Sequence, residues 1–330
     1  MGQGLLTIGV LLLLTLAVAA CGDGQPKPGD EFRDCSECPV MVVIQPGKFM
    51  MGASPEEVSG AGDSVRPGYF GTPQVKVTIG NAFAVGKFEV SIQEFTSCVQ
   101  DGGCGSRQSS LGEQYPIQSV TGVSWYNAKN YVAWLSKKTG KHYRLLSESE
   151  WEYVSRAGTT TAFWWGDDPG RNRAAFRYCC DKTSPEELKD LGNKFHDIPI
   201  EDRFRPFLQS HTLFPGALPG EVFLPNAFGL YQTIGNVDEW VEDCWHPSLE
   251  DEPRDGTPWR GDDPDCQWRV TRGGNYVSPV DYVRNSVRNY LDSRMNCVED
   301  SGPPNPICLK ENTPQRISRP IIGLRVARDL

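Results

Sequence analysis

The spacing of apolar residues predicts short strands separated by turns. Residues 41–44 form a β-branched run that ends at Pro46 and Gly47, and a second apolar run follows at residues 49–52, so the two runs predict a hairpin. Residues 75–79 alternate between apolar and polar side chains, as in a half-buried strand. Further short strands are predicted at residues 88–90, 268–270 and 323–328.

Three helices are predicted from serines that cap a first turn. Ser91 and Ser147 are each followed three residues later by a glutamate, which is the capping-box pattern. Ser124 precedes a third segment with apolar residues at helical spacing. Periodicity disappears from residue 159 to residue 226, and so long an irregular stretch needs disulfides or bound cations to order it. The glycines predicted to end the three helices are Gly102, Gly140 and Gly158.

Composition limits the class of partner and the number of domains. The chain has 330 residues and a net charge of −9, so it lacks the basic excess that nucleic-acid binding requires, and we expect no nucleic-acid partner. No internal repeat and no second core are evident. The simplest organisation is one folded domain over residues 35–330.

The first part of the chain has the features of an export signal. Residues 5–20 are apolar and uncharged, and small residues precede Cys21, a pattern that resembles a bacterial lipoprotein signal. We therefore predict a signal peptide at residues 1–20, lipidation of Cys21, and a flexible tether at residues 21–34, which would anchor the protein to a membrane of the bacterial cell envelope. Residues 1–4 carry no Lys or Arg, so an ordinary secretory signal with a chance cysteine is the alternative.

Cysteine usage agrees with export. Of the eleven cysteines, Cys21 is the predicted site of lipidation, which leaves an even number in a chain that would reside where disulfides persist. The connectivity of Cys35, Cys38, Cys179 and Cys180 stays open, and a zinc site formed by these four is the alternative to disulfides. Proximity in sequence predicts the pairs Cys98–Cys104, Cys244–Cys266 and Cys297–Cys308.

Eight short motifs, in order along the chain, resemble the formylglycine-generating enzyme (sulfatase-modifying factor) family. The resemblance implies an α+β domain with a C-type-lectin-like core, much irregular structure, and disulfides and bound calcium as braces. The motifs lie at residues 41–52, 88–90, 116–125, 143–153, 226–231, 235–240, 272–274 and 323–325.

A calcium site is predicted next to Trp240. The segment that precedes this residue offers a carboxylate, an amide and turn carbonyls, the hard oxygen ligands that Ca²⁺ prefers. The family resemblance places the ion on Asn236, Val237 and Glu239. The alternative is that Asn236 and Glu239 only cap a turn.

The family resemblance also locates an oxidase site and shows that it has changed here. Catalytic members bind copper(I) through two cysteines that follow a Gly-Gly turn, and the corresponding residues here are Ser278 and Val283. A hydroxyl is a poor copper(I) ligand and an isopropyl group is none, so we expect neither copper nor formylglycine generation. Some exported members of the family without the cysteine pair act in siderophore maturation. An oxidoreductase of this type, with an unrecognised site, is therefore the alternative function.

The residues after the Gly-Gly turn favour binding. Tyr and Arg are enriched at binding hot spots, and Asn is an adaptable hydrogen-bonding residue. The competing interpretation is that Tyr282, Arg284 and Arg288 pack inward as a structural ion-pair network. We predict a non-catalytic, lipid-anchored protein that binds or scaffolds an envelope protein or a small ligand. The candidate pocket consists of Asn275, Tyr276, Ser278, Tyr282, Arg284 and Arg288.

Overall fold

The computed structural model describes most of the chain from residue 26 onward. Within this part, no helix is long and apolar enough to cross a membrane. The predictions for residues 1–20, Cys21, Cys179, Cys180 and the Cys297–Cys308 pair lie outside the described residues. The described residues are 26–61, 68–105, 116–170, 173–177, 217–261, 265–293 and 321–330.

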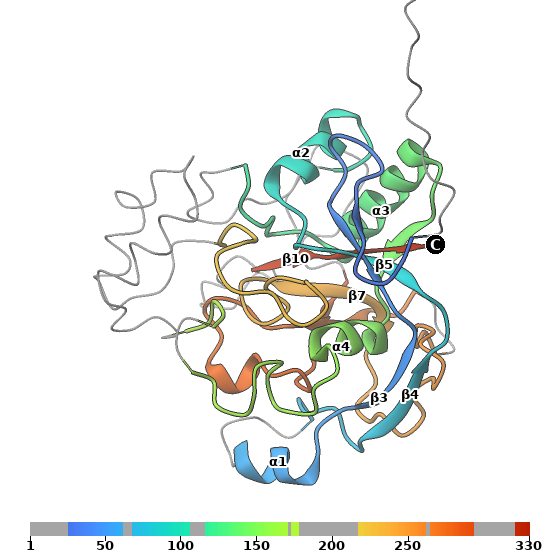
Figure 1. Ribbon diagram of the computed structural model, residues 1–330. Helices are drawn as coiled ribbons and strands as arrows, with labels where there is room; N and C mark the ends of the chain where they lie inside the picture. The colour runs from blue at the N-terminus through green and yellow to red at the C-terminus, as the bar shows by residue number, and fades with distance from the viewer. Residues whose placement is uncertain are drawn as a thin grey trace, which may run out of the picture.

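A five-stranded antiparallel sheet carries the first core. Its strand order is β1-β2-β5-β11-β6, and helix α3 packs beside it together with α2 (Figure 1). Tyr131 of α3 stacks on Phe95 of α2 with 5.7 Å between ring centroids, so aromatic side chains fill the space between the two helices. The strands are β1 (Glu31–Phe32), β2 (Met41–Ile44), β5 (Phe83–Gly86), β11 (Val326–Asp329) and β6 (Tyr143–Leu145).

A four-stranded sheet forms the second layer and positions the candidate site. Its order is β10-β7-β8-β9, with β10 parallel to β7 and the other pairs antiparallel. One C-terminal strand was predicted at residues 323–328, but the chain forms two, one in each large sheet, with the buried Arg325 between them. The four strands are β10 (Ile322–Leu324), β7 (Asp238–Cys244), β8 (Trp268–Arg272) and β9 (Asn289–Asp292).

The predicted hairpin at residues 41–52 is wrong. Strand β3 (Gly47–Met51) pairs with β4 (Val75–Ile79) in a separate two-stranded sheet, whereas β2 pairs with β1 and β5. The Tyr153 hydroxyl donates a hydrogen bond to the Gln45 carbonyl (3.1 Å), and this ring lies where a Cβ on Gly47 would be. Tyr153 therefore packs against the connection, which leads from one sheet to the other.

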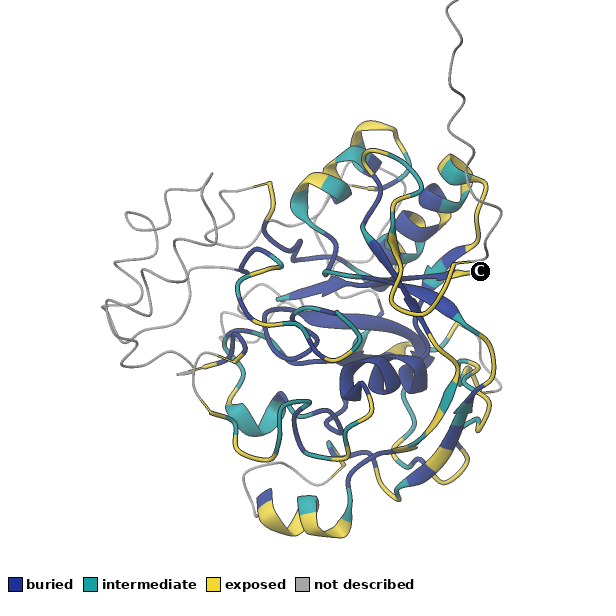
Figure 2. Ribbon diagram, viewed as in Figure 1, coloured by how far each residue is buried: buried dark blue, intermediate teal, exposed yellow. Residues whose placement is uncertain are grey.

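The helix starts follow the predicted caps. Both capping boxes and the Ser124 cap are present, and Gly140 ends its helix in the left-handed conformation. All nine residues of α4 are buried, which Figure 2 shows as a dark blue helix inside the molecule. The predicted strand at residues 88–90 is wrong, because the strand in this part of the chain is β5, which ends at Gly86. The helices are α1 (Pro55–Ala61), α2 (Ile92–Gln100), α3 (Trp125–Thr139), α4 (Glu148–Arg156) and the 3₁₀ helix η2 (Val280–Tyr282).

Three disulfides lie within the described residues. Cys98–Cys104 and Cys244–Cys266 are bonded as predicted. Cys35 is bonded to Cys38, which overturns the zinc alternative for this pair because disulfide sulfurs are not thiolate ligands.

The predicted tether at residues 21–34 is too long at its C-terminal end. Strand β1 pairs with β2, and the Gly29 N–H donates to the Val43 carbonyl (2.8 Å). The Asp34 carboxylate accepts a hydrogen bond from the Tyr143 hydroxyl at 2.7 Å. Residues 29–34 therefore belong to the folded domain, which begins before Cys35.

Candidate functional site

Helix α4 brings charged side chains into the interior beside the second sheet. The Glu152 carboxylate accepts hydrogen bonds from the Gly52 N–H (2.8 Å), from Arg156 Nε (2.8 Å) and from Arg272 Nη2 (2.5 Å). Burial acts to raise the pKa of Glu152, but Arg156 and Arg272 outweigh burial and hold the pKa below its usual value. Glu152 is therefore a buried anion between two guanidinium groups.

Arg288 belongs to the same buried network. It donates two hydrogen bonds to Glu148, Nε to Oε1 at 2.5 Å and Nη2 to Oε2 at 2.7 Å, and a third to the His246 carbonyl at 2.8 Å. Its side chain is fully buried. The prediction that Arg288 lines a binding pocket is wrong, because a buried guanidinium needs these acceptors and packs inward to reach them.

The Gly-Gly turn packs its backbone directly on η2 and the residue that follows it. Gly273 and Gly274 have φ values of +91° and +69°. A Cβ on Gly274 would lie 2.6 Å from Val283 Cγ1 and 2.8 Å from the Tyr282 carbonyl oxygen. Glycine is therefore needed here both for its conformation and for the close approach.

A cavity of about 280 Å³ lies beside this turn. The Asp238 carboxylate accepts a hydrogen bond from Asn275 Nδ2 at 2.5 Å, and Ser278 Oγ accepts one from the Asn275 N–H at 3.1 Å. Burial raises the pKa of Asp238 to about 7, and the negative charge of Glu239 acts in the same direction. The cavity is lined by Tyr69, Asp238, Thr271, Arg272, Gly273, Gly274, Ser278, Pro279, Tyr282, Val287 and Asn289.

Only part of the predicted pocket faces this cavity. Ser278 and Tyr282 line it, and Asn275 contacts it through Asp238. Tyr276 is buried in an apolar cluster, so its assignment to the pocket is wrong. Arg284 pairs with Asp281 at 2.6 Å.

Sequence reasoning missed several lining residues. Asp238 was visible in the 235–240 motif, but its neighbours were assigned to calcium. Asn289 reaches the cavity because β9 pairs with β8 in the register that sets it opposite Thr271. Tyr69 lies in a glycine-rich segment without periodicity, so no signal in the sequence indicated it.

The two positions that correspond to the copper ligands have different surroundings. Ser278 lies on the cavity wall. Val283 is fully buried in an apolar cluster with Phe163 and Ile234 and does not line the cavity. Among the described lining residues there is neither a thiol nor an imidazole, so these residues do not fit a copper(I) ion.

Two of the three predicted calcium ligands, Asn236 and Glu239, have oxygens that accept hydrogen bonds from other residues of the chain. Asn236 Oδ1 accepts from the Leu218 N–H (2.7 Å), and the Asn236 carbonyl accepts from the Tyr276 N–H (3.0 Å). The Glu239 carboxylate accepts from Arg325 Nη2 (2.7 Å) and Trp151 Nε1 (2.8 Å). Because a guanidinium already neutralises Glu239, these side chains do not fit a calcium ion in this arrangement. Both side chains bond to residues far away in sequence, so the alternative of a local turn cap does not describe them either.

The Glu89 side chain contacts the turn that contains Asn236 and Val237. The Val237 N–H donates to Glu89 Oε1 at 3.3 Å, and the Ser119 hydroxyl donates to Oε2 at 2.6 Å. Burial and the charge of Glu239 raise the pKa of Glu89 to about 8. The hydrogen bond from Val237 therefore holds this turn against the buried carboxyl group of Glu89.

Comparison with known proteins shows which family this chain matches. Residues 27–298 match the sulfatase-modifying factor enzyme 1-like domain. The chain belongs to this family. The match confirms the resemblance and, with the mixed sheets and helices described above, the α+β fold of the sulfatase-modifying-factor type.

Relatives within the family match different shares of the chain. The formylglycine-generating enzyme of Bos taurus is 25% identical over an alignment of 290 positions, and the match covers 73% of this chain and 67% of that protein. The enzyme of Mus musculus is 31% identical over 166 residues, 49% of this chain and 36% of that protein. The match thus spans only about a third of the mouse enzyme. PvdO from Pseudomonas aeruginosa has a solved structure that matches 93% of this chain and 100% of its own, with a TM-score of 0.66 and 29% identity.

Proposed function

We propose that this sulfatase-modifying-factor domain is the non-catalytic, ligand-binding part of an exported protein anchored to the cell envelope through lipidated Cys21. The observation that carries the proposal is the wall of the cavity, where Ser278 replaces one thiolate, while Val283 replaces the other and is buried away from it. A cavity retained without its redox ligands is suited to binding. The partner is a small ligand or an envelope protein.

The charges around the cavity favour a cationic ligand. The positive charge of Arg272 is neutralised by its ion pair with Glu152, and that of Arg284 by its ion pair with Asp281. Asp238 has the neutral amide of Asn275 as its hydrogen-bond partner, so its carboxylate can accept a hydrogen bond from an amine or guanidinium group.

Aromatic walls support the same ligand chemistry. Tyr69 and Tyr282 both line the cavity and meet edge to face, with ring centroids 5.6 Å apart. A cation near an aromatic face gains about 0.5–2 kcal/mol. The volume of about 280 Å³ is at the lower limit for small-molecule sites, which suits a small amine or the end of a partner's Lys or Arg side chain.

The location is supported by the leader and by the disulfides. The Cys98–Cys104 and Cys244–Cys266 bonds persist in oxidising compartments outside the cytosol. An uncharged apolar segment that ends in small residues before Cys21 supports a lipoprotein signal, although residues 1–4 carry no Lys or Arg. In the proposed arrangement, the short segment after Cys21 holds the domain near the membrane surface.

A titration calorimetry experiment tests the binding proposal. The probe is lysine blocked at both its α-amino and carboxyl groups, and its control is the same molecule acetylated on Nε. We expect the charged probe to bind the wild-type domain, the neutral probe to fail, and Asp238→Asn to weaken binding at least tenfold. Failure of the charged probe to bind, or equal affinity for Asp238→Asn, would overturn the cationic assignment.

The second candidate is an oxidoreductase that uses a site other than a cysteine pair. The specific observation in its favour is similarity to the formylglycine-generating enzyme of Bos taurus over 73% of this chain. Conversion of a cysteine peptide separates the two functions, because a binding domain leaves the peptide unchanged.

A further inference from the structure

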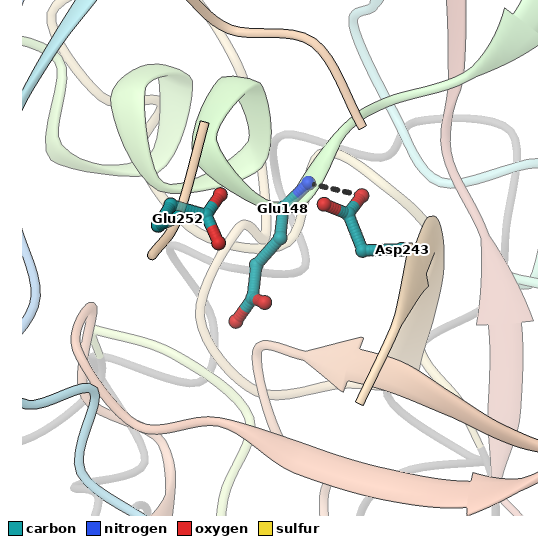
Figure 3. A group of neighbouring side chains, drawn as sticks. All are labelled: Glu148, Asp243 and Glu252. Carbon is teal, nitrogen blue, oxygen red and sulfur yellow. Dashed lines mark hydrogen bonds between the residues drawn. The ribbon is translucent and has the colours of Figure 1, made fainter. Parts of the chain in front are cut away.

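Three buried carboxylates meet at the N-terminus of α4, away from the motif to which calcium was assigned. Oxygens of Glu148, Asp243 and Glu252 all lie within 4.8 Å of one another. In Figure 3 the carboxylates of Asp243 and Glu252 approach Glu148 from opposite sides. The three residues come from α4, from strand β7 and from the loop after β7, so the group joins separate parts of the chain.

Glu252 makes this group unusual. Its residue exposure is 2%, and neither of its carboxylate oxygens has a hydrogen-bond partner among the described residues. A buried carboxylate without partners costs several kcal/mol, so the side chain needs either a cation or a proton. Because one of its oxygens faces Glu148 and Asp243, any such cation would contact all three groups.

The other two carboxylates have partners but retain capacity to bind a cation. Asp243 accepts one backbone hydrogen bond on each oxygen, from the Glu148 N–H (2.8 Å) and the Trp259 N–H (2.8 Å). Glu148 accepts from Arg288, and more weakly from Arg272 at 3.3 Å. Each carboxylate oxygen can accept a second interaction.

Formal charges around the group leave an excess of negative charge. Arg156, Arg272 and Arg288 are the guanidinium groups of this buried network, and they face four carboxylates. The difference is one negative charge. These guanidinium groups pair with Glu148 and Glu152, Asp243 accepts only backbone hydrogen bonds, and Glu252 has no hydrogen-bond partner among the described residues. The four carboxylates are Glu148, Glu152, Asp243 and Glu252.

We propose that Glu148, Asp243 and Glu252 bind a hard divalent cation, calcium by size. All three ligands are carboxylate oxygens, which exclude a preference for soft metals. Calcium binds oxygen at about 2.4 Å in flexible geometry, whereas the smaller magnesium ion demands near-ideal octahedral geometry at about 2.1 Å and usually keeps several waters, which suits a buried group of carboxylates less well. Water or carbonyl oxygens complete the coordination.

The cation would fasten a disulfide-closed loop to the interior helix. Glu252 lies within the loop that the Cys244–Cys266 bond closes, and the Gly256 carbonyl in the same loop accepts a hydrogen bond from Ser147 Oγ (2.8 Å). Through Glu148, the site also contacts Arg272, which lines the cavity. Occupancy would thus stabilise the wall of the candidate site.

Thermal unfolding and metal analysis of the mature protein test this proposal. After dialysis against chelator, adding calcium should raise the melting temperature of the wild type by at least about 5 °C. Glu252→Gln should lose this response, and Glu250→Gln, an exposed residue of the same loop, should keep it. Wild-type protein exchanged into chelator-free buffer should retain one calcium per chain, a result that does not depend on the variant folding.

Two results would overturn the assignment. One is a wild-type melting temperature that calcium does not change, with Glu252→Gln at least as stable as the wild type, because then Glu252 carries a proton. The other is an undiminished calcium response in Glu252→Gln, because then any calcium binds elsewhere.

Discussion

Arg288 and Glu148 form an ion pair with two hydrogen bonds. Arg288 directly precedes β9, and Glu148 is the first residue of α4. Both side chains are fully buried, and the pair joins residues separated by 140 positions in sequence. The pair fixes β9 against the interior helix. It therefore supports the neighbouring cavity wall at Val287 and Asn289 without contributing to the cavity itself.

Arg288→Met should destabilise the domain strongly. It leaves Glu148 without its principal cation, next to Asp243, and breaking a buried pair costs about 3–5 kcal/mol. Arg260→Met is the matched control, because Arg260 is 52% exposed and its partner Glu242 also pairs with Lys129, so the cost should stay below about 1 kcal/mol. Chemical denaturation measures both values, and equal costs would contradict the structural role.

Gly274→Ala should cost more than Gly140→Ala, although both glycines have φ of +69°. Each substitution carries the left-handed strain of roughly 1–2 kcal/mol. Only at Gly274 does the added Cβ meet Val283 and the Tyr282 carbonyl, whereas nothing lies within 4 Å at Gly140. Overpacking of this kind adds about 1–3 kcal/mol. Denaturant midpoints that fall equally for the two variants would show that the turn can move away.

Cysteines introduced at the two former ligand positions should differ in reactivity. Ser278→Cys places a thiol on the cavity wall, and Val283→Cys places one inside an apolar cluster. Labelling of folded protein with maleimide should be fast for Ser278→Cys. Val283→Cys should react only on unfolding, and similar rates for the two thiols would mean that both positions face the cavity.

Cys21→Ala should release the protein from the membrane fraction when it is expressed with its own leader in a bacterial host. The reason is that the lipid is attached through this thiol in the proposed arrangement. Fractionation with immunodetection measures the distribution, and mass spectrometry of the wild type should show an acylated N-terminal cysteine. A variant that stays in the membrane fraction would argue against lipidation.

Local rules predicted the helices well. Ser91 and Ser147 with their glutamates specify the starts of α2 and α4 through contacts within one turn, so sequence alone was sufficient. The hairpin at residues 41–52 failed because strand pairing is decided by partners far along the chain. Tyr153, about a hundred positions away, packs against the connection between β2 and β3.

The candidate site was predicted only in part for the same reason. The family resemblance, together with the count from the Gly-Gly turn, predicted that Ser278 and Val283 stand at the positions of the copper ligands. Which of Tyr276, Tyr282 and Arg288 face the cavity depends on the register of β8 and β9 and on the buried acids of α4. An amphipathic pattern cannot reveal a helix that is buried on every side.

One measurement tests most directly the proposal that this domain does not carry out the oxidase chemistry. The mature domain, supplied with copper(I) and oxygen, is incubated with a sulfatase-type peptide that contains the target cysteine, beside a catalytic family member as positive control. Mass spectrometry should find the peptide unchanged, because the described residues that line the cavity, Ser278 included, offer no thiolate. Conversion of its cysteine to the aldehyde would contradict the proposed function.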